Sequence, residues 1–185
     1  MTDRVARAVI LAAGTSSRIG KQKLLMDFRG RLLIENAIAA AQRWHPVVVC
    51  GREVAEYLAL RSDLSLVPND EPERGMSHSL ALANRHLASD VSMLVVLGDK
   101  PLVSEALIET ICAAMHDVDI VYPERDDEPG HPVLLSPRAR RFIEYLPSGD
   151  TLRLLRSNPH LTSRAVQTDD PGAFFDVDTI EALSS

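Results

Sequence analysis

Short apolar runs alternate with longer amphipathic segments over the first two thirds of the chain. Strands are expected where apolar residues are continuous, at 7–13, 46–51, 64–69, 92–99 and 119–123. Helices are expected where apolar residues recur every three or four positions, at 32–44, 53–60, 77–88 and 104–116. Ser77 and Ser104 stand at two of these starts, where a hydroxyl can cap the first turn. Strands that are apolar on both faces indicate a mostly parallel central sheet with helices on both faces, a three-layer α/β fold of Rossmann-like type.

The pattern loosens after residue 123. A turn-rich stretch at 125–136 leads into a short strand, and two short helices are expected at 137–146 and 150–157. Strands are then expected at 163–168 and 174–178, followed by a short helix from Thr179. Because no internal repeat or long linker interrupts the 185 residues, we expect a single domain over 1–185.

Composition narrows the class of protein. An apolar content of 45% is enough for a core, and a net charge of −6 argues against nucleic acid as a partner. The apolar stretch at 5–13 is interrupted by Arg7 and is too short to span a bilayer, and no signal peptide is visible, so no membrane partner is expected. Cys50 and Cys112 lie far apart in apolar segments, which predicts two buried thiols in a reducing, cytoplasmic setting.

The loop after the first strand reads GTSSRIGKQK from Gly14 to Lys23. Five residues separate Gly14 from Gly20, and Gln22 stands where a P-loop needs a hydroxyl. The dinucleotide fingerprint fails as well, because only one of its glycines is present. Two glycines, Arg18 and Lys23 after a buried strand would suit a polyphosphate site that grips through backbone and side chains. An ordinary strand–helix turn with surface cations remains the alternative.

A carboxylate follows the expected strand at 92–99. In a parallel sheet, ligands bind at the carboxyl ends of the strands, so the Gly14 loop and Asp99 should open on the same side. Asp99 near a polyphosphate is placed to hold Mg²⁺, although a turn-forming role is equally compatible with the residue alone. Asp176 and Asp178 alternate on the expected strand and should share one face, where one of them would complete the metal site. Asp178 also fits an N-cap.

Taken together, these motifs resemble the MobA-like nucleotidyltransferases. The family's signature loop is matched at Leu11, Ala12, Ala13, Gly14, Ser16, Arg18, Gly20 and Lys23. GDKP at 98–101 resembles the metal-binding motif, and RGMSHSL at 74–80 resembles the nucleobase segment. GHPVLLS at 130–136 and FFDVDTIEAL at 174–183 resemble segments of the molybdenum cofactor cytidylyltransferase branch. Two residues depart from the pattern: Lys100 replaces the usual Gln or Met, and Ile180 replaces Pro.

The resemblance implies a reaction and its residues. A terminal phosphate of a molybdopterin-type acceptor would attack the α-phosphorus of a nucleoside triphosphate, CTP by the best-matching branch, and release pyrophosphate. Lys23 and Arg18 are implied to be catalytic, and Asp99 with Asp176 or Asp178 to hold Mg²⁺. The implied nucleotide contacts are Leu11, Ala12, Ala13, Gly14, Ser16, Gly20, Gly75, Met76, Ser77 and Ser79. Those implied for the acceptor are Gly130 and His131.

Other functions stay open at this point. A guanylyltransferase of the same fold would use GTP and make the guanine dinucleotide. A nucleotide-binding regulator that has lost turnover would bind a triphosphate without releasing pyrophosphate, and Lys100 beside the metal position is the residue that raises this alternative. An active enzyme of this branch would also pass its product to a molybdoenzyme or to that enzyme's chaperone.

Overall fold

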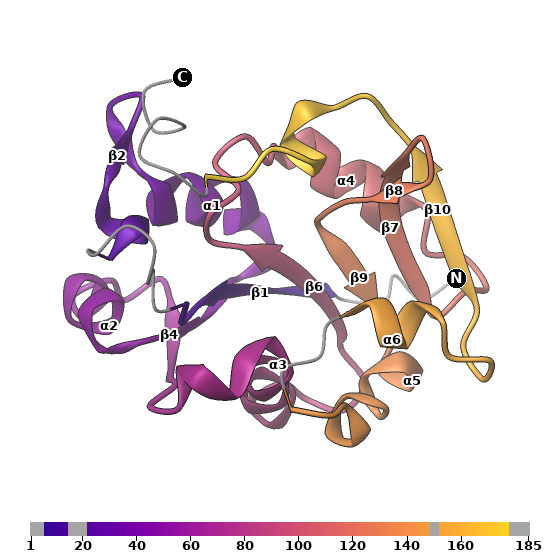
Figure 1. Ribbon diagram of the computed structural model, residues 1–185. Coiled ribbons are helices and arrows are strands. Elements are labelled where there is room, and N and C mark those ends of the chain that lie inside the picture. Colours follow the sequence, from indigo (N-terminus) through magenta and orange to yellow (C-terminus); the bar gives the residue numbers. More distant parts are fainter. Residues whose placement is uncertain (1–5, 15–21, 149–151, 178–185) are drawn as a thin grey trace.

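The computed structural model describes residues 6–14, 22–148 and 152–177 (Figure 1). Within them, eight strands form one sheet in the order β10-β7-β9-β6-β1-β4-β5, with β8 paired to β7. The strands are β1 (Ala6–Ala12), β4 (Val47–Cys50), β5 (Ser65–Pro68), β6 (Ser92–Leu97), β7 (Ile120–Arg125), β8 (Glu128–Pro129), β9 (Val133–Leu135) and β10 (Ser163–Gln167). Pairs that involve β8 or β9 are antiparallel and the other pairs are parallel, which confirms the expected mostly parallel sheet.

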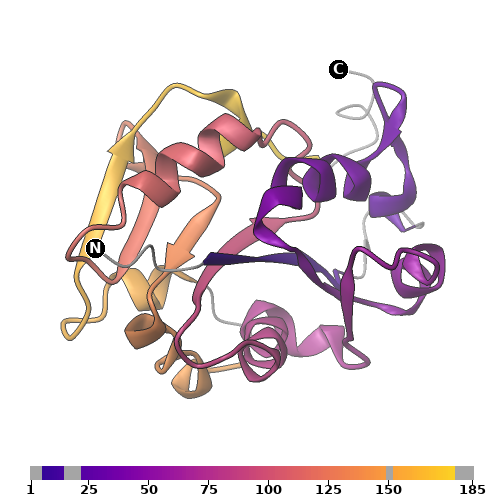
Figure 2. The same ribbon diagram turned by 180° about the vertical axis from the view of Figure 1, so that it is seen from behind.

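Helices cover both faces of this sheet, as the apolar strands predicted. Figure 1 shows α1 and α4 on one face and α3, α5 and α6 on the other, and Figure 2 shows the same layers from behind. The helices are α1 (Leu33–Ala41), α2 (Arg52–Leu58), α3 (Gly75–His86), α4 (Glu105–Ala113), α5 (Pro137–Arg140) and α6 (Leu152–Arg156). A small hairpin of β2 (Asp27–Phe28) and β3 (Arg31–Leu32), which the apolar pattern did not indicate, lies outside the main sheet.

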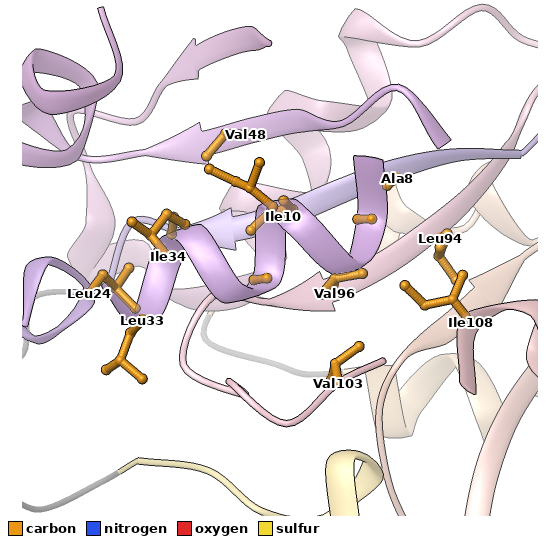
Figure 3. Packing of buried hydrophobic residues seen from close by; sticks show 14 of the residues in the cluster. Ala8, Ile10, Leu24, Leu33, Ile34, Val48, Leu94, Val96, Val103 and Ile108 are labelled. Atoms are coloured by element: carbon orange, nitrogen blue, oxygen red, sulfur yellow. The ribbon is translucent and has the colours of Figure 1, made fainter. Parts of the chain in front are cut away.

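Alternate residues of each central strand enter two separate hydrophobic clusters. On β1, Ala8 and Ile10 pack with residues of α1, α2 and α4, whereas Val9 packs with residues of α3, α5 and α6. Figure 3 shows part of the first cluster, with Ile10 and Val96 from neighbouring strands beside α1. A fully buried Ile or Leu side chain stabilises a fold by about 1.5–3 kcal/mol. The two clusters therefore stabilise the central sheet from both faces.

The start of α3 differs from the prediction, because the helix begins at Gly75 and Ser77 already lies inside it. A short 3-10 helix, Pro72–Arg74, precedes it, and Gly75 has a φ of 79°, which lets the chain turn between the two. The N-cap residue of α3 is Arg74, with no side-chain cap hydrogen bond, so the cap expected at Ser77 is wrong. At α4 the expected cap is confirmed, since Ser104 Oγ accepts from the Leu107 backbone N–H at 3.1 Å.

The strand expected at 174–178 is wrong over its described part. Residues 174–177 follow the short 3-10 helix Pro171–Ala173 without forming a strand, although Phe174 and Phe175 still pack against the core. The backbone of this closing segment (residues 174–177) bonds to the loop after β6 instead of to a sheet edge, because the Val177 N–H donates to the Asp99 carbonyl at 3.1 Å. Asp178, Ile180 and the helix expected from Thr179 lie outside the described residues.

Both cysteines are free thiols, and they differ in burial. Cys50 is fully buried in β4, whereas Cys112 on α4 is only partly buried, which corrects the expectation of two buried thiols. Burial raises the pKa of each thiol to about 11. Across the described ranges, no helix is long and apolar enough to cross a membrane.

Candidate active site

A cleft of about 220 Å³ opens at the carboxyl edge of the parallel strands. It lies between the residues that follow β1 and β6 and the start of α3, as expected for ligands of a parallel sheet. Many of the residues singled out from the sequence line it together: Leu11, Ala13, Gly14, Lys23, Gly75, Met76, Ser79 and Asp99. Ala12 points the other way, into the core beneath α1, because side chains alternate along β1.

Lys23 and Asp99 form an ion pair on the wall of this cleft. Lys23 Nζ donates to Asp99 Oδ2 at 2.8 Å and to the Val177 carbonyl at 2.9 Å. The two side chains are 15% and 25% exposed, so water screens this pair less than it screens a surface pair. Two residues 76 positions apart thus meet at the sheet edge, as the carboxyl-edge rule predicted.

Short backbone contacts hold both partners in place. The Gly98 N–H donates to the Leu11 carbonyl at 3.0 Å, which carries the β1–β6 ladder up to Asp99. A Cβ on Gly98 would stand 3.2 Å from that carbonyl oxygen, so a side chain would strain this close approach. On the other side, Gln22 donates from Nε2 to the Gly14 carbonyl at 3.4 Å and accepts at Oε1 from the Leu24 N–H at 3.4 Å. The Gln22 side chain thus ties the residues on both sides of Lys23 to the end of β1.

Asp176, one of the two residues considered as a second metal ligand, lies near Lys100 and does not line the cleft. Asp176 is half-exposed, and its Oδ2 lies 4.0 Å from Lys100 Nζ, which also donates to the Phe174 carbonyl at 3.1 Å. Lys100, 5% exposed, therefore turns its charge toward the closing segment. In residues 6–14, 22–148 and 152–177, no three His, Cys, Asp or Glu side chains are grouped closely enough to hold a metal ion by themselves. Asp99 is thus the carboxylate that lines the cleft, and Asp178 lies outside the described chain.

The far end of the cleft is formed by α3. Gly75, Met76 and Ser79 line it, whereas Ser77 lines a separate hollow of about 130 Å³ with Arg74 and other residues. That placement sets Ser77 apart from the other three residues of its motif. Ser16, Arg18 and Gly20 lie in 15–21, outside the described residues, so their expected roles remain predictions.

Sequence reasoning missed Asn69, a buried amide beside this end of the cleft. Its Nδ2 donates to Ser79 Oγ at 3.0 Å, and its Oδ1 accepts from the Glu71 N–H at 2.9 Å. The signal was present, since Asn69 directly follows β5 at the same carboxyl edge. Polar residues in that position are the ones that reach a ligand in a parallel sheet.

Gly130 and His131 follow one another between β7 and the short 3-10 helix Pro171–Ala173. The Gly130 N–H donates to the Pro123 carbonyl at 2.8 Å, and the His131 N–H donates to the Ala173 carbonyl at 2.9 Å. A Cβ on Gly130 would stand 2.6 Å from the Ala173 oxygen, so this close approach requires glycine. Gly130 is thus bonded to β7, and His131 is bonded to Ala173, the residue just before the closing segment.

The His131 imidazole is electrostatically unusual. Its Nδ1 is buried and has no hydrogen-bond partner among the described residues. Burial, followed by the charges of Lys100 and Arg156, lowers the pKa of His131 to about 3, so the ring is neutral near pH 7. Arg156, which sequence reasoning missed, lies on α6 with its guanidinium 5.0 Å from the centre of the Tyr122 ring, and burial lowers its pKa.

Comparison with known proteins places this arrangement in a family. The model of the MobA-like NTP transferase domain matches residues 8–163. Nicotine blue oxidoreductase of Paenarthrobacter nicotinovorans is 27% identical over 190 residues, which cover 95% of this chain and 93% of that protein. Molybdenum cofactor cytidylyltransferase of Escherichia coli K12 is 26% identical over 133 residues, which cover 69% of this chain and 68% of that protein.

Solved structures agree on the fold. A crystal structure of Rv0371c from Mycobacterium tuberculosis H37Rv matches all of both chains, with a TM-score of 0.85 and 22% identity. Its manganese complex covers 97% of this chain and 96% of that one, with a TM-score of 0.78 and 21% identity. Since the family match spans most of the sequence, this chain belongs to the MobA-like NTP transferase family of nucleotidyltransferases.

Proposed function

We propose that this protein transfers a cytidylyl group from CTP to the terminal phosphate of a molybdopterin-type acceptor and releases pyrophosphate. The observation that carries the proposal is the Lys23–Asp99 pair on the wall of the cleft. It combines a cation for phosphate oxygens with a carboxylate for a divalent ion, the two groups that nucleotidyl transfer needs. The similarity to a molybdenum cofactor cytidylyltransferase supports the choice of CTP and of the acceptor.

The chain's own groups suit a reaction that depends on position and charge. A phosphate monoester is a competent nucleophile near pH 7, so no strong general base is required. Lys23 Nζ, which contacts Asp99 and the Val177 carbonyl, would turn to the phosphate oxygens of the nucleotide and neutralise charge as pyrophosphate leaves. Arg18 is proposed to add a second, bidentate contact on the same phosphates.

A divalent ion fits the cleft through Asp99. Mg²⁺ is usually held by one or two carboxylates together with substrate phosphates and water, so a single lining carboxylate is compatible with it. When bound, Mg²⁺ would neutralise phosphate charge. Asp178 is proposed as the second ligand rather than Asp176, because Asp176 faces Lys100.

The acceptor is proposed to bind along Gly130 and His131. A neutral imidazole that carries its proton on one ring nitrogen can accept a hydrogen bond at the other, which suits an N–H donor of a pterin ring. The buried Nδ1 of His131 has no such partner within the described chain. Lys100 and Arg156 are close enough to lower the pKa of His131, so they place positive charge near a phosphorylated acceptor.

A second candidate function, redox chemistry, is tested in the same experiment. The relative that aligns over 95% of this chain is an oxidoreductase, which favours redox chemistry on the same fold as the alternative. The test is to mix the protein with Mg²⁺ and molybdopterin, which carries the terminal phosphate, and to measure pyrophosphate release from CTP, GTP or UTP. NADH and NADPH oxidation is followed at 340 nm with the same acceptor.

Pyrophosphate from CTP, dependent on the acceptor, is the expected result. Release from GTP instead would change the product to the guanine dinucleotide and keep the mechanism. Binding of a triphosphate without pyrophosphate release would identify a regulator. Oxidation of NADH or NADPH without nucleotide consumption would overturn the proposal in favour of an oxidoreductase.

A further inference from the structure

Asn69 is an almost fully buried amide that no part of the proposed reaction uses. It stands directly after β5 and is 2% exposed. Its backbone N–H donates to the Cys50 carbonyl at 2.9 Å, so the main chain is fixed by the β4–β5 edge. Its side chain contacts the backbone at Glu71 on one side and Ser79 on the other.

These contacts fix which way the amide faces. The Glu71 N–H can only donate, so the atom that accepts from it at 2.9 Å must be the Asn69 oxygen. The other end of the amide is then NH₂, which donates to Ser79 Oγ at 3.0 Å. The Asn69 side chain is therefore oriented by chemistry that a flipped amide would violate.

The same bond sets the direction of the Ser79 hydroxyl. A hydroxyl has one proton and two lone pairs, and Asn69 occupies one lone pair. Among the described residues, Ser79 donates its own proton to no acceptor, although it lines the cleft. The proton is thus available to a group inside the cleft. The second lone pair could still accept from a donor there, but the Ser79 proton would then have no acceptor among the described residues, so an acceptor is the better partner for Ser79.

We infer that Asn69 is a positioning residue that sets Ser79 as a hydrogen-bond donor toward the nucleobase, so that the cleft selects a base edge made of acceptors. This inference rests on the proposed function, because it takes the base to bind beside α3. Cytosine presents two adjacent acceptors, O2 and N3. Uracil carries an N–H at position 3, from which Ser79 could accept only by leaving its own proton without an acceptor among the described residues. The ligand class is therefore a cytosine nucleotide, selected against its near-isosteric uracil counterpart.

The test compares binding of CTP and UTP in the presence of Mg²⁺ by calorimetry. Asn69→Asp keeps the oxygen that accepts from Glu71 but replaces the NH₂ donor by a second oxygen. The Ser79 proton then turns to that carboxylate, and lone pairs face the base. A buried group left without its partner costs about 1–3 kcal/mol, so the ratio of CTP to UTP affinity should fall by about tenfold or more. Ser79→Ala should lower the same ratio, and Asn69→Asp added to Ser79→Ala should lower it no further.

Two measurements separate this effect from simple damage. Inorganic tripolyphosphate with Mg²⁺ has no base, so its affinity depends on charge and fold alone. Ser79→Ala should therefore bind it as tightly as wild type does. Thermal melting checks that each variant is folded, and Ser79→Ala keeps the test decisive if Asn69→Asp does not fold. The inference is overturned if the CTP to UTP ratio of a folded Asn69→Asp variant or of Ser79→Ala stays within threefold of wild type, or if wild type binds the two nucleotides equally. Discrimination that depends on Ser79, without any pyrophosphate release, would instead refute the proposed reaction and leave the positioning role intact.

Discussion

On one side of β6 the strands β1, β4 and β5 are all parallel, and on the other side the antiparallel β9 separates β6 from β7. In the parallel half, residues that follow a strand reach the cleft, as Asp99 does after β6. In the β9 half the order is reversed: Val95 is paired with Val133, so the residues before β9 lie toward the same edge. One reversed strand thus brings a preceding segment, Gly130 and His131, to the edge where the other strands end.

Each half also contains one lysine bound to the closing segment, partly buried in one half and fully buried in the other. In the cleft, Lys23 contacts Asp99 and the Val177 carbonyl. Beside β9, Lys100 contacts the Phe174 carbonyl and stands near Asp176. Both ammonium groups donate to a carbonyl of the closing segment, but of the two only Lys23 lines the cleft. We therefore propose that Lys23 contacts the nucleotide phosphates, whereas Lys100 holds the closing segment and supplies charge near the acceptor.

Replacing each lysine by Met is the strongest test of whether Lys23 and Lys100 have different roles. Lys23→Met should lower the rate of pyrophosphate release about 10²–10³-fold, because one preorganised charge is lost in the transition state. Lys100→Met should stay within about tenfold, since its charge serves the closing segment. Initial rates at saturating CTP and acceptor are the measurement. Equal losses in both variants would mean that the two halves share the catalytic charge.

Arg140 joins the halves, and its loss should have the next largest effect. It lies on α5 and is 4% exposed, and its guanidinium donates to carbonyl oxygens at the end of α3, those of Ala88 at 2.7 Å and Asn84 at 3.1 Å among them. Arg140→Met leaves these buried acceptors unpaired and should lower the free energy of unfolding by about 3 kcal/mol. Urea denaturation measures this, with Arg141→Met as the exposed control, expected within about 0.5 kcal/mol of wild type. A small loss in Arg140→Met would show that the halves hold together without it.

The neutral His131 gives the β9 half a pH dependence. Its pKa is lowered to about 3 in the folded protein, so from about pH 6.5 down to 3 the unfolded chain binds one more proton than the folded one. Stability is full above pH 6.5 and should fall on acidification by up to about 1.4 kcal/mol per pH unit from this group. Urea midpoints at pH 7, 6 and 5 follow the loss, and His131→Asn should flatten the slope. An unchanged slope in that variant would contradict the buried, neutral imidazole.

The smallest effect compares two serines that look alike in the sequence. Ser104→Ala should cost about 1 kcal/mol, because the hydroxyl caps α4. Ser77→Ala removes no cap, so it should cost clearly less than Ser104→Ala. Thermal melts of both variants decide this, and equal losses would contradict the helix start at Gly75.

The parts that could be predicted from sequence are those where one local rule dominates. Continuous apolar runs identified the central strands because both faces of the sheet are covered, as the two clusters around Ile10 and Val9 confirm. The carboxyl-edge rule predicted that the Gly14 loop and Asp99 open on the same side of the sheet, and Gly14 and Asp99 line one cleft. The ion pair between Lys23 and Asp99 was not predicted. That residues 1–185 form one domain stays a prediction.

What escaped prediction depends on tertiary context. The FFDV segment alternates like a strand, but two lysines and Asp99 take its backbone groups, and it joins no sheet. Pro72 and the positive φ of Gly75 moved the start of α3 away from Ser77. Arg156 comes near His131 only through the docking of α6, which no pattern within α6 reveals.

The closing segment is synthesised after the other elements that it contacts, which affects when the site can form. Residues 174–177 leave the ribosome after every other described residue of the cleft, and they carry the carbonyls that Lys23 and Lys100 bind. A nascent chain that ends at β10 has its sheet and cleft walls, but neither lysine has its backbone acceptor. The site is therefore tightened only after residues 174–177 have been made, and a chain cut short before them presents Asp99 without the backbone N–H of Val177 that secures its loop.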